Sequence, residues 1–118
     1  MHLFNLKINR FKIRRKRTFE LIKTGIKWLE VRLERGIFAN IKENTVLELY
    51  NGHNNIRVIV IDIKRLNSME ELINDRLMRI GSTPEVSDKD IRRYYRQFYS
   101  KAALRRNKVI VLRIKRVS

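Results

Sequence analysis

Three charged side chains that could contact a phosphate or a base lie close together in the segment 25–33. They are Lys27, Glu30 and Arg32. A Lys and an Arg beside a groove can each bind a phosphate, while a carboxylate can hold the Arg or accept a hydrogen bond from a base amine. The plain alternative is an exposed ion pair that stabilises the fold by less than about 1 kcal/mol. Taken alone, these three residues favour that alternative.

Two further groups of cations suggest contacts with a polyanion. A basic arm at about residues 10–17 suits a single-strand groove or a duplex backbone equally, and its alternative is a solvated loop. A late helix carries arginines that could pair with phosphates, while Tyr94, Tyr95 and Phe98 at helical spacing are more typical of a core. Trp28 shares a side with Glu30 and could either stack on a base or cover an end of the fold. The cations proposed for binding are Lys12, Arg14, Arg15, Lys16, Arg17, Arg92, Arg93 and Arg96.

The composition supports an anionic partner. The chain has 118 residues, with 28 Lys and Arg against 12 Asp and Glu, a formal net charge of +16 and a pI near 11.0. Such a charge destabilises a compact state by self-repulsion, so a polyanion that neutralises it is the favoured interpretation. With no Cys and only two His residues, we expect no metal site and no cofactor. The absence of a signal peptide and of a long apolar stretch predicts a cytoplasmic protein with no membrane contact.

Period-two and helical patterns predict the elements that position these residues. The segment 27–33 alternates as a strand, with Leu29 and Val31 opposite Glu30 and Arg32. Segment 57–66 reads as a strand covered on both faces, joined to its neighbour by a loop longer than two residues. Thr18 should cap the first helix, Gly25 should end it in a left-handed conformation, and Ser68 with Glu71 should form a capping box. The expected strands are 3–8, 27–33, 46–50, 57–66 and 109–117, and the expected helices are 18–24, 68–80 (closed by Gly81) and 87–102.

The segment from Gly25 to Leu33 resembles the G-x-K-x-x-E-x-R signature of the ASCH domain, a branch of the PUA-like superfamily of RNA-associated barrels. Residues 19–22 are similar to the helix before the signature, and residues 66–72 to a helix start of the family. Asn44-Thr45 stands where the family usually has Gly-Asp, and Asn tolerates the same left-handed turn. The resemblance implies one α+β domain over residues 1–118. It would be a small mixed β-barrel of about five to six strands with two or three flanking helices.

With the resemblance, the basic cleft beside the signature becomes the favoured interpretation of Lys27, Glu30 and Arg32. We expect a nucleic-acid binding protein, with RNA favoured over DNA. Some members of the family hydrolyse N4-acetylcytidine with a Lys and a Thr spaced K-x-x-T, and Glu30 stands here in the position of that Thr, which argues against an enzyme. The alternatives are an RNA-processing enzyme of that kind or a ribonuclease, with Lys27 and Glu30 as the candidate catalytic residues. The second alternative is a coactivator-type interaction domain that binds DNA. The sequence does not indicate an oligomeric state.

Overall fold

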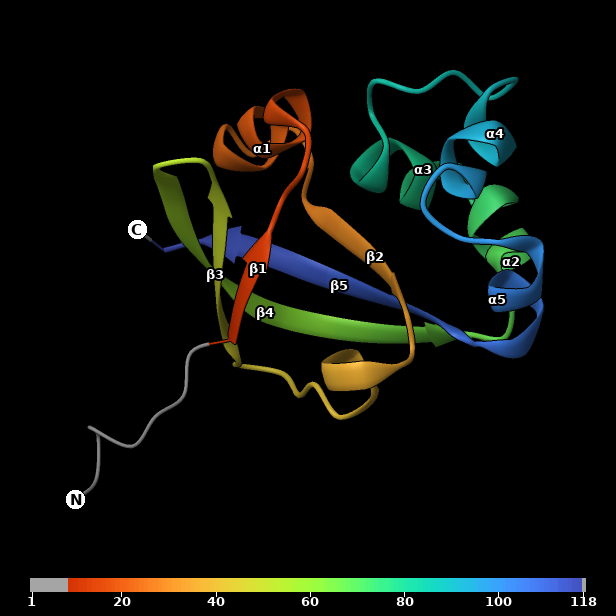
Figure 1. Ribbon diagram of the computed structural model, residues 1–118, viewed down its shortest axis with the longest axis horizontal. Coiled ribbons are helices and arrows are strands. Elements are labelled where there is room, and N and C mark those ends of the chain that lie inside the picture. Colours follow the sequence, from red (N-terminus) through yellow and green to blue (C-terminus); the bar gives the residue numbers. More distant parts are fainter. Residues whose placement is uncertain (1–8, 118) are drawn as a thin grey trace.

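The computed structural model describes residues 9–117, so the strand expected at 3–8 lies outside the described residues. Short helices accompany the strands of a single sheet without regular alternation along the chain, as the mixed sequence patterns predicted (Figure 1). In chain order the elements are β1 (Asn9–Lys12), α1 (Lys16–Lys23), β2 (Leu29–Leu33), the 3-10 helix η2 (Gly36–Ala39), β3 (Val46–Asn51), β4 (Asn54–Leu66), α2 (Met69–Ile73), α3 (Arg76–Ser82), α4 (Ile91–Arg96), α5 (Lys101–Arg106) and β5 (Val109–Arg116).

The described strands form one curved sheet of five, in the order β1-β3-β4-β5-β2. Strand β1 pairs with β3 in parallel, and every other neighbouring pair is antiparallel. In Figure 1, helices α2 to α5 gather together at one end of the sheet, while α1 lies away from them near β3. The α+β class and the mixed barrel-like sheet expected from the sequence are confirmed. Strands β1 and β2 are the two edges, and the functional side chains come from both.

Strand β5 carries the core on both of its faces. Ile110, Leu112 and Ile114 are buried in a cluster under α1, whereas Val109 and Val111 are buried in a second cluster beneath the other helices. The sequence also predicted that the strand at 57–66 is covered on both faces. That prediction is wrong, because Ile61 of β4 is 42% exposed. An uninterrupted run of β-branched residues does not by itself distinguish a strand covered on both faces from one with a solvated apolar face.

Two turns differ from the expectation in an informative way. The loop between β3 and β4 is a two-residue hairpin, since Asn51 pairs with Asn54, and Gly52 takes a φ of +60°. The prediction of a loop longer than two residues was therefore wrong. The first helix begins at Lys16 with Arg15 as its N-cap, so Thr18 lies inside the helix and does not cap it. Gly25, with a φ of +82°, follows the end of the helix as predicted.

Each of the two later helices is broken into a pair. The segment expected as one helix over 68–80 divides at Asn74 and Asp75, because the Asp75 side chain accepts a hydrogen bond from the Met78 amide and starts α3 afresh. The segment 87–102 likewise divides into α4 and α5, and Ser100 caps α5 by accepting from the Ala103 amide. The predicted capping box does not form. The Glu71 carboxylate accepts from the amide of Asn67 at 2.7 Å, one residue before Ser68, and the Ser68 side chain makes no cap hydrogen bond.

Gly81 fixes how closely α3 approaches the start of β2. It was expected to close a helix but lies within α3, where a Cβ would come within 2.8 Å of Trp28 Cε2 and 2.9 Å of Leu29 Cδ1. The Trp28 amide also donates to the Gly81 carbonyl at 3.0 Å. This close backbone contact joins the helical layer to the strand that carries the signature residues.

Gly81→Ala should therefore destabilise the protein, although Gly to Ala in a helix ordinarily stabilises by up to about 1 kcal/mol. We expect a loss of about 1–3 kcal/mol in unfolding free energy, because the added methyl group overpacks against Trp28 and Leu29. Urea denaturation measures this, with the exposed Arg76→Ala in the same helix as a control that changes stability by less than about 0.5 kcal/mol. A gain in stability for Gly81→Ala would contradict the close contact.

Candidate nucleic-acid interface

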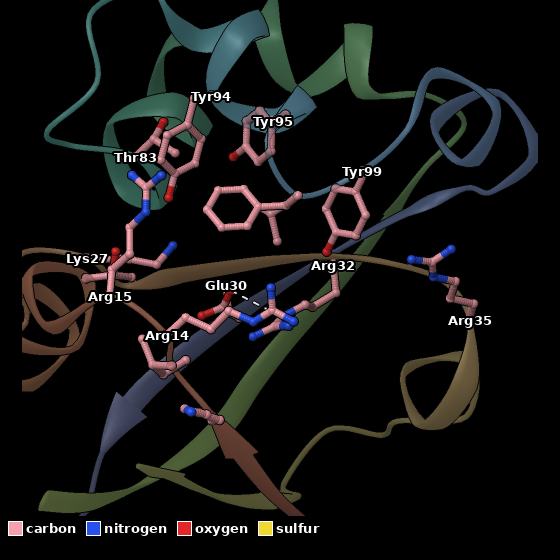
Figure 2. Close-up of a pocket in the computed structure, with 15 residues that line it drawn as sticks. Arg14, Arg15, Lys27, Glu30, Arg32, Arg35, Thr83, Tyr94, Tyr95 and Tyr99 are labelled. Atoms are coloured by element: carbon pink, nitrogen blue, oxygen red, sulfur yellow. Dashed lines mark ion pairs between the residues drawn. The ribbon is translucent and has the colours of Figure 1, made fainter. Parts of the chain in front are cut away.

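A hollow of about 270 Å³ opens between residues that follow β1, residues of β2 and the end of α4. We call it the edge pocket, because its two charged walls come from β1 and β2, the two edges of the sheet. Figure 2 shows Glu30 and Arg32 facing Tyr94, Tyr95 and Tyr99 across this space. Its lining residues are Lys12, Ile13, Arg14, Arg15, Thr18, Lys27, Glu30, Val31, Arg32, Arg35, Thr83, Tyr94, Tyr95, Phe98 and Tyr99.

Positive charge is concentrated around this pocket. Six of its lining side chains are cationic and one, Glu30, is a carboxylate. Lys12 and Arg14 are exposed at its β1 side. Arg15 reaches across to α4, where its guanidinium carbon lies 5.2 Å from the centroid of the Phe98 ring and its Nη2 donates to the side-chain carbonyl of Gln97. The basic arm is therefore not a solvated loop, because it runs through β1 into α1 and forms a wall of the pocket.

Lys27 lies at the base of the pocket with only 6% of its surface exposed. Its ammonium donates to the Leu29 carbonyl at 2.7 Å and to the Ser82 carbonyl at 2.5 Å. Burial lowers the pKa of Lys27 below its ordinary value, while the nearby carboxylates of Glu30 and Glu85 oppose that shift. Two of the three ammonium donors are thus used by the fold, which leaves one for a ligand.

Glu30 and Arg32 form an ion pair whose hydrogen bonds are incomplete. Arg32 Nε lies 3.4 Å from Glu30 Oε1, and the Arg32 guanidinium lies 5.3 Å from the centroid of the Phe38 ring. Among the described residues, neither Glu30 Oε2 nor Arg32 Nε has a hydrogen-bond partner, although both atoms are buried. Unmade hydrogen bonds of this kind are costly in a folded protein. The pair therefore retains one acceptor and one donor for a polar group that enters the pocket.

Aromatic rings make up the wall opposite the charges. Tyr95 was assigned to the core and is buried there, whereas Phe98 is 38% exposed and Tyr94 and Tyr99 are half-buried. Burial is the main cause that raises the pKa of all three tyrosines. Their hydroxyls stay protonated at neutral pH and can donate to phosphate or base oxygens. Stacking of unpaired bases on such rings stabilises complexes by about 1–3 kcal/mol per base.

Three pocket residues were not predicted as site residues. Arg35 lies just after the signature strand and Thr18 just after the basic arm, whereas Thr83 is brought to the pocket from a distant part of the chain. Arg35 lies with its guanidinium carbon 5.6 Å from the centroid of the Tyr99 ring. A stretch of aromatic residues next to arginines, 92–99, was the one signal in the sequence that pointed to this wall.

Other predicted binding residues lie outside the edge pocket. Lys16 and Arg17 are exposed in the first turn of α1. Positive charge at this end of a helix interacts unfavourably with the helix dipole, and here it adds to the positive field near the pocket. Trp28 lines a different hollow beside Ile114, with the Arg113 guanidinium carbon 5.8 Å from its ring centroid. Arg93 is exposed and lies outside the lining of the edge pocket, while Arg92 and Arg96 line a separate hollow on the helical layer.

No group of three or more His, Cys, Asp or Glu side chains in residues 9–117 is placed to hold a metal ion. Over the same residues, every helix is too short or too polar to cross a membrane.

Comparison with known proteins identifies the fold. No family model and no curated protein matches the chain. The hypothetical protein PH0355 has a TM-score of 0.81 at 24% identity, covering 94% of this chain and 100% of that one. Protein PF0455 from Pyrococcus furiosus has a TM-score of 0.76 at 24% identity, covering 95% and 99%. The ASCH structure from Zymomonas mobilis has a TM-score of 0.60 at 13% identity, covering 90% of this chain and 65% of that one.

The chain has an ASCH-like fold. The resemblance read from the segment 25–33 is thereby confirmed at the level of the fold. At these identities the likeness does not carry over any activity, so function is inferred from the edge pocket itself. Its features are a cationic rim, an aromatic wall and one carboxylate.

The buried Tyr95 makes stability depend on pH above its ordinary pKa of 10.0. Because the folded state keeps this proton while the unfolded chain releases it, the unfolding free energy should fall as the pH rises above 10.0. In Tyr95→Phe, the unfolding free energy should fall less steeply with pH, by up to about 1.4 kcal/mol per pH unit. Urea denaturation between about pH 8 and 11 measures it, and near neutral pH the variant and the wild type should show no such difference in slope. Equal slopes above the ordinary tyrosine pKa would contradict the burial of this hydroxyl.

Proposed function

We propose that this protein binds nucleic acid, and RNA in preference to DNA, through the edge pocket. The observation that carries the proposal is the ratio of charges around one hollow, with six cations against a single carboxylate and aromatic rings on the facing wall. A net charge of +16 supplies a favourable field for any polyanion. The ASCH-like fold adds support, since the PUA-like superfamily is associated with RNA.

Each wall has a distinct part in the proposed binding. Lys12 and Arg14 at the exposed rim contact phosphates, and Phe98 with Tyr99 offers faces on which an unpaired base stacks. The carboxylate of Glu30 accepts a hydrogen bond from a base amine. RNA is favoured because loops, bulges and ends present splayed-out bases that can enter a hollow, whereas bases in a duplex stay stacked.

The double variant Lys12→Ala/Arg14→Ala should bind single-stranded RNA on the order of tenfold more weakly, because two phosphate contacts are lost. The slope of log affinity against log salt should flatten by roughly 0.7 for each contact removed. Fluorescence titration with single-stranded RNA, transfer RNA, single-stranded DNA and duplex DNA at two salt concentrations measures both effects.

The matched control is Lys42→Ala/Lys89→Ala, which removes the same charge from exposed positions outside the edge pocket. It should keep nearly all of the wild-type affinity. Equal weakening in both double variants would mean that charge acts without a defined site. Affinity that is flat with salt, or tighter binding to duplex DNA than to RNA, would overturn the proposal. Salt-resistant capture of a purified protein with no nucleic-acid affinity would favour the interaction-domain alternative.

A hydrolytic activity on RNA or on a modified nucleoside is the second candidate. The observation in its favour is Lys27, an amine with a lowered pKa that faces the same pocket as Thr83. The Thr83 hydroxyl, however, donates to the Arg79 carbonyl at 3.0 Å. Glu30 occupies the position of the Thr that the amidohydrolase members of the family use, and a carboxylate cannot replace that hydroxyl in the same mechanism.

If such turnover exists, it should be abolished in Lys27→Ala and retained in Arg92→Ala, since Arg92 lies outside the edge pocket. Incubation with N4-acetylcytidine and with end-labelled RNA, with and without EDTA, measures it. Because Lys27 is buried, Lys27→Met serves as a second variant that fills the same volume without the amine. Activity that survives in both Lys27 variants, or no turnover by the wild type, would remove this candidate.

A further inference from the structure

A second hollow, of about 400 Å³, lies on the helical layer between α2, α4 and α5. Aliphatic side chains of Met69, Ile73 and Leu104 line it. Three exposed cations, Arg96, Lys101 and Arg105, also line it. We call these six residues the α4–α5 groove.

The charge of this groove is almost entirely positive. Its one carboxylate, Glu70, is engaged by Arg92, whose Nη2 donates to Glu70 Oε2 at 2.9 Å and whose Nη1 donates to the other oxygen. That hydrogen bond lowers the pKa of Glu70, so the carboxylate stays ionised and compensates Arg92. No ion pair joins Arg96, Lys101 or Arg105 to any carboxylate within residues 9–117. Three positive charges therefore remain uncompensated at one groove.

Helix α4 separates the groove from the edge pocket. Tyr95 lines both hollows, Tyr94 and Phe98 line only the edge pocket, and Arg96 lines only the groove. Tyr94 of α4 and Phe98, which follows α4, are thus presented to the edge pocket, whereas Arg96 at the end of α4 is presented to the groove. The two hollows are neighbours, because Tyr95 lines both of them. Figure 1 shows α4 close to α2 and α5.

We infer that a nucleic-acid strand whose base enters the edge pocket continues across α4, and that its sugar-phosphate backbone binds in the α4–α5 groove. This inference rests on the proposed function and extends it to a second contact surface. The guanidinium groups of Arg96 and Arg105 suit phosphate oxygens in a bidentate geometry. Met69, Ile73 and Leu104 offer no ring for a base to stack on, so they contact sugars while the bases stay outside. A mononucleotide occupies the edge pocket alone, and a longer strand occupies both surfaces.

The test compares two lengths of single-stranded RNA, about 3 and about 15 nucleotides, the second near the upper end of site sizes for small single-strand binding domains. The variant is Arg96→Ala/Lys101→Ala/Arg105→Ala, in which each Ala is compatible with the helix. Its affinity for the long strand should fall on the order of tenfold or more, and its salt slope should flatten by roughly 2, at about 0.7 per phosphate. Its affinity for the short strand should match that of the wild type.

The matched control is Lys42→Ala/Lys64→Ala/Lys89→Ala, which removes three exposed charges from outside both surfaces and should change neither affinity by more than about twofold. Circular dichroism of both triple variants establishes that they are folded. Equal long-strand affinity in the groove variant and the control overturns the inference while the proposed function stands. A parallel loss for both strand lengths in the groove variant overturns it too. A wild type that binds neither strand defeats the proposed function itself.

Discussion

The fold depends on one buried ammonium group. Lys27 joins the start of β2 to the end of α3 by donating to the carbonyls of Leu29 and Ser82, at 2.7 and 2.5 Å. A buried charge is tolerated only when its hydrogen bonds are made, so this pair of bonds fixes where the helical layer sits against the sheet. The amide of Trp28 adds a third link to the Gly81 carbonyl. The aromatic wall of the edge pocket is joined to β2 through packing, because Ile91 and Tyr95 of α4 share one core cluster with the buried residues of β2.

The edge pocket exists because the sheet does not close into a complete barrel. Strands β1 and β2 are the two edges, and an edge strand with free backbone groups is a site where other chains could pair. Here β1 has four residues, two of them cationic, which discourages such pairing. Of these two, Lys12 also lines the edge pocket, whereas Arg10 forms an ion pair with Glu48. One cation of this edge therefore both discourages strand pairing and adds to the positive charge of the pocket.

The sequence predicted those features of the fold that depend on residues close together in the chain. The alternation of β2 and the left-handed Gly25 were read correctly, because a strand period and a turn conformation depend on near neighbours. The burial of Lys27 was not foreseeable, since its partner Ser82 is 55 residues away. Helix continuity over 68–80 was also misjudged, because the cap at Asp75 overrides the apolar pattern. The signature residues and the basic arm were found in the sequence, but the tyrosine wall meets them only through tertiary packing.

The distribution of charge favours a polymer over a small ligand. A single nucleotide would neutralise a small part of a net charge of +16, and the cations at the rim of the edge pocket would remain in mutual repulsion. A strand brings one phosphate for every nucleotide and releases a counterion for each contact, so its affinity grows with the number of cations that it reaches. Tyr94 of α4 and Phe98 after it line the edge pocket, whereas Arg96 of α4 and Lys101 and Arg105 of α5 line the α4–α5 groove. A strand that reached both hollows would therefore meet the aromatic wall in one and three further cations in the other.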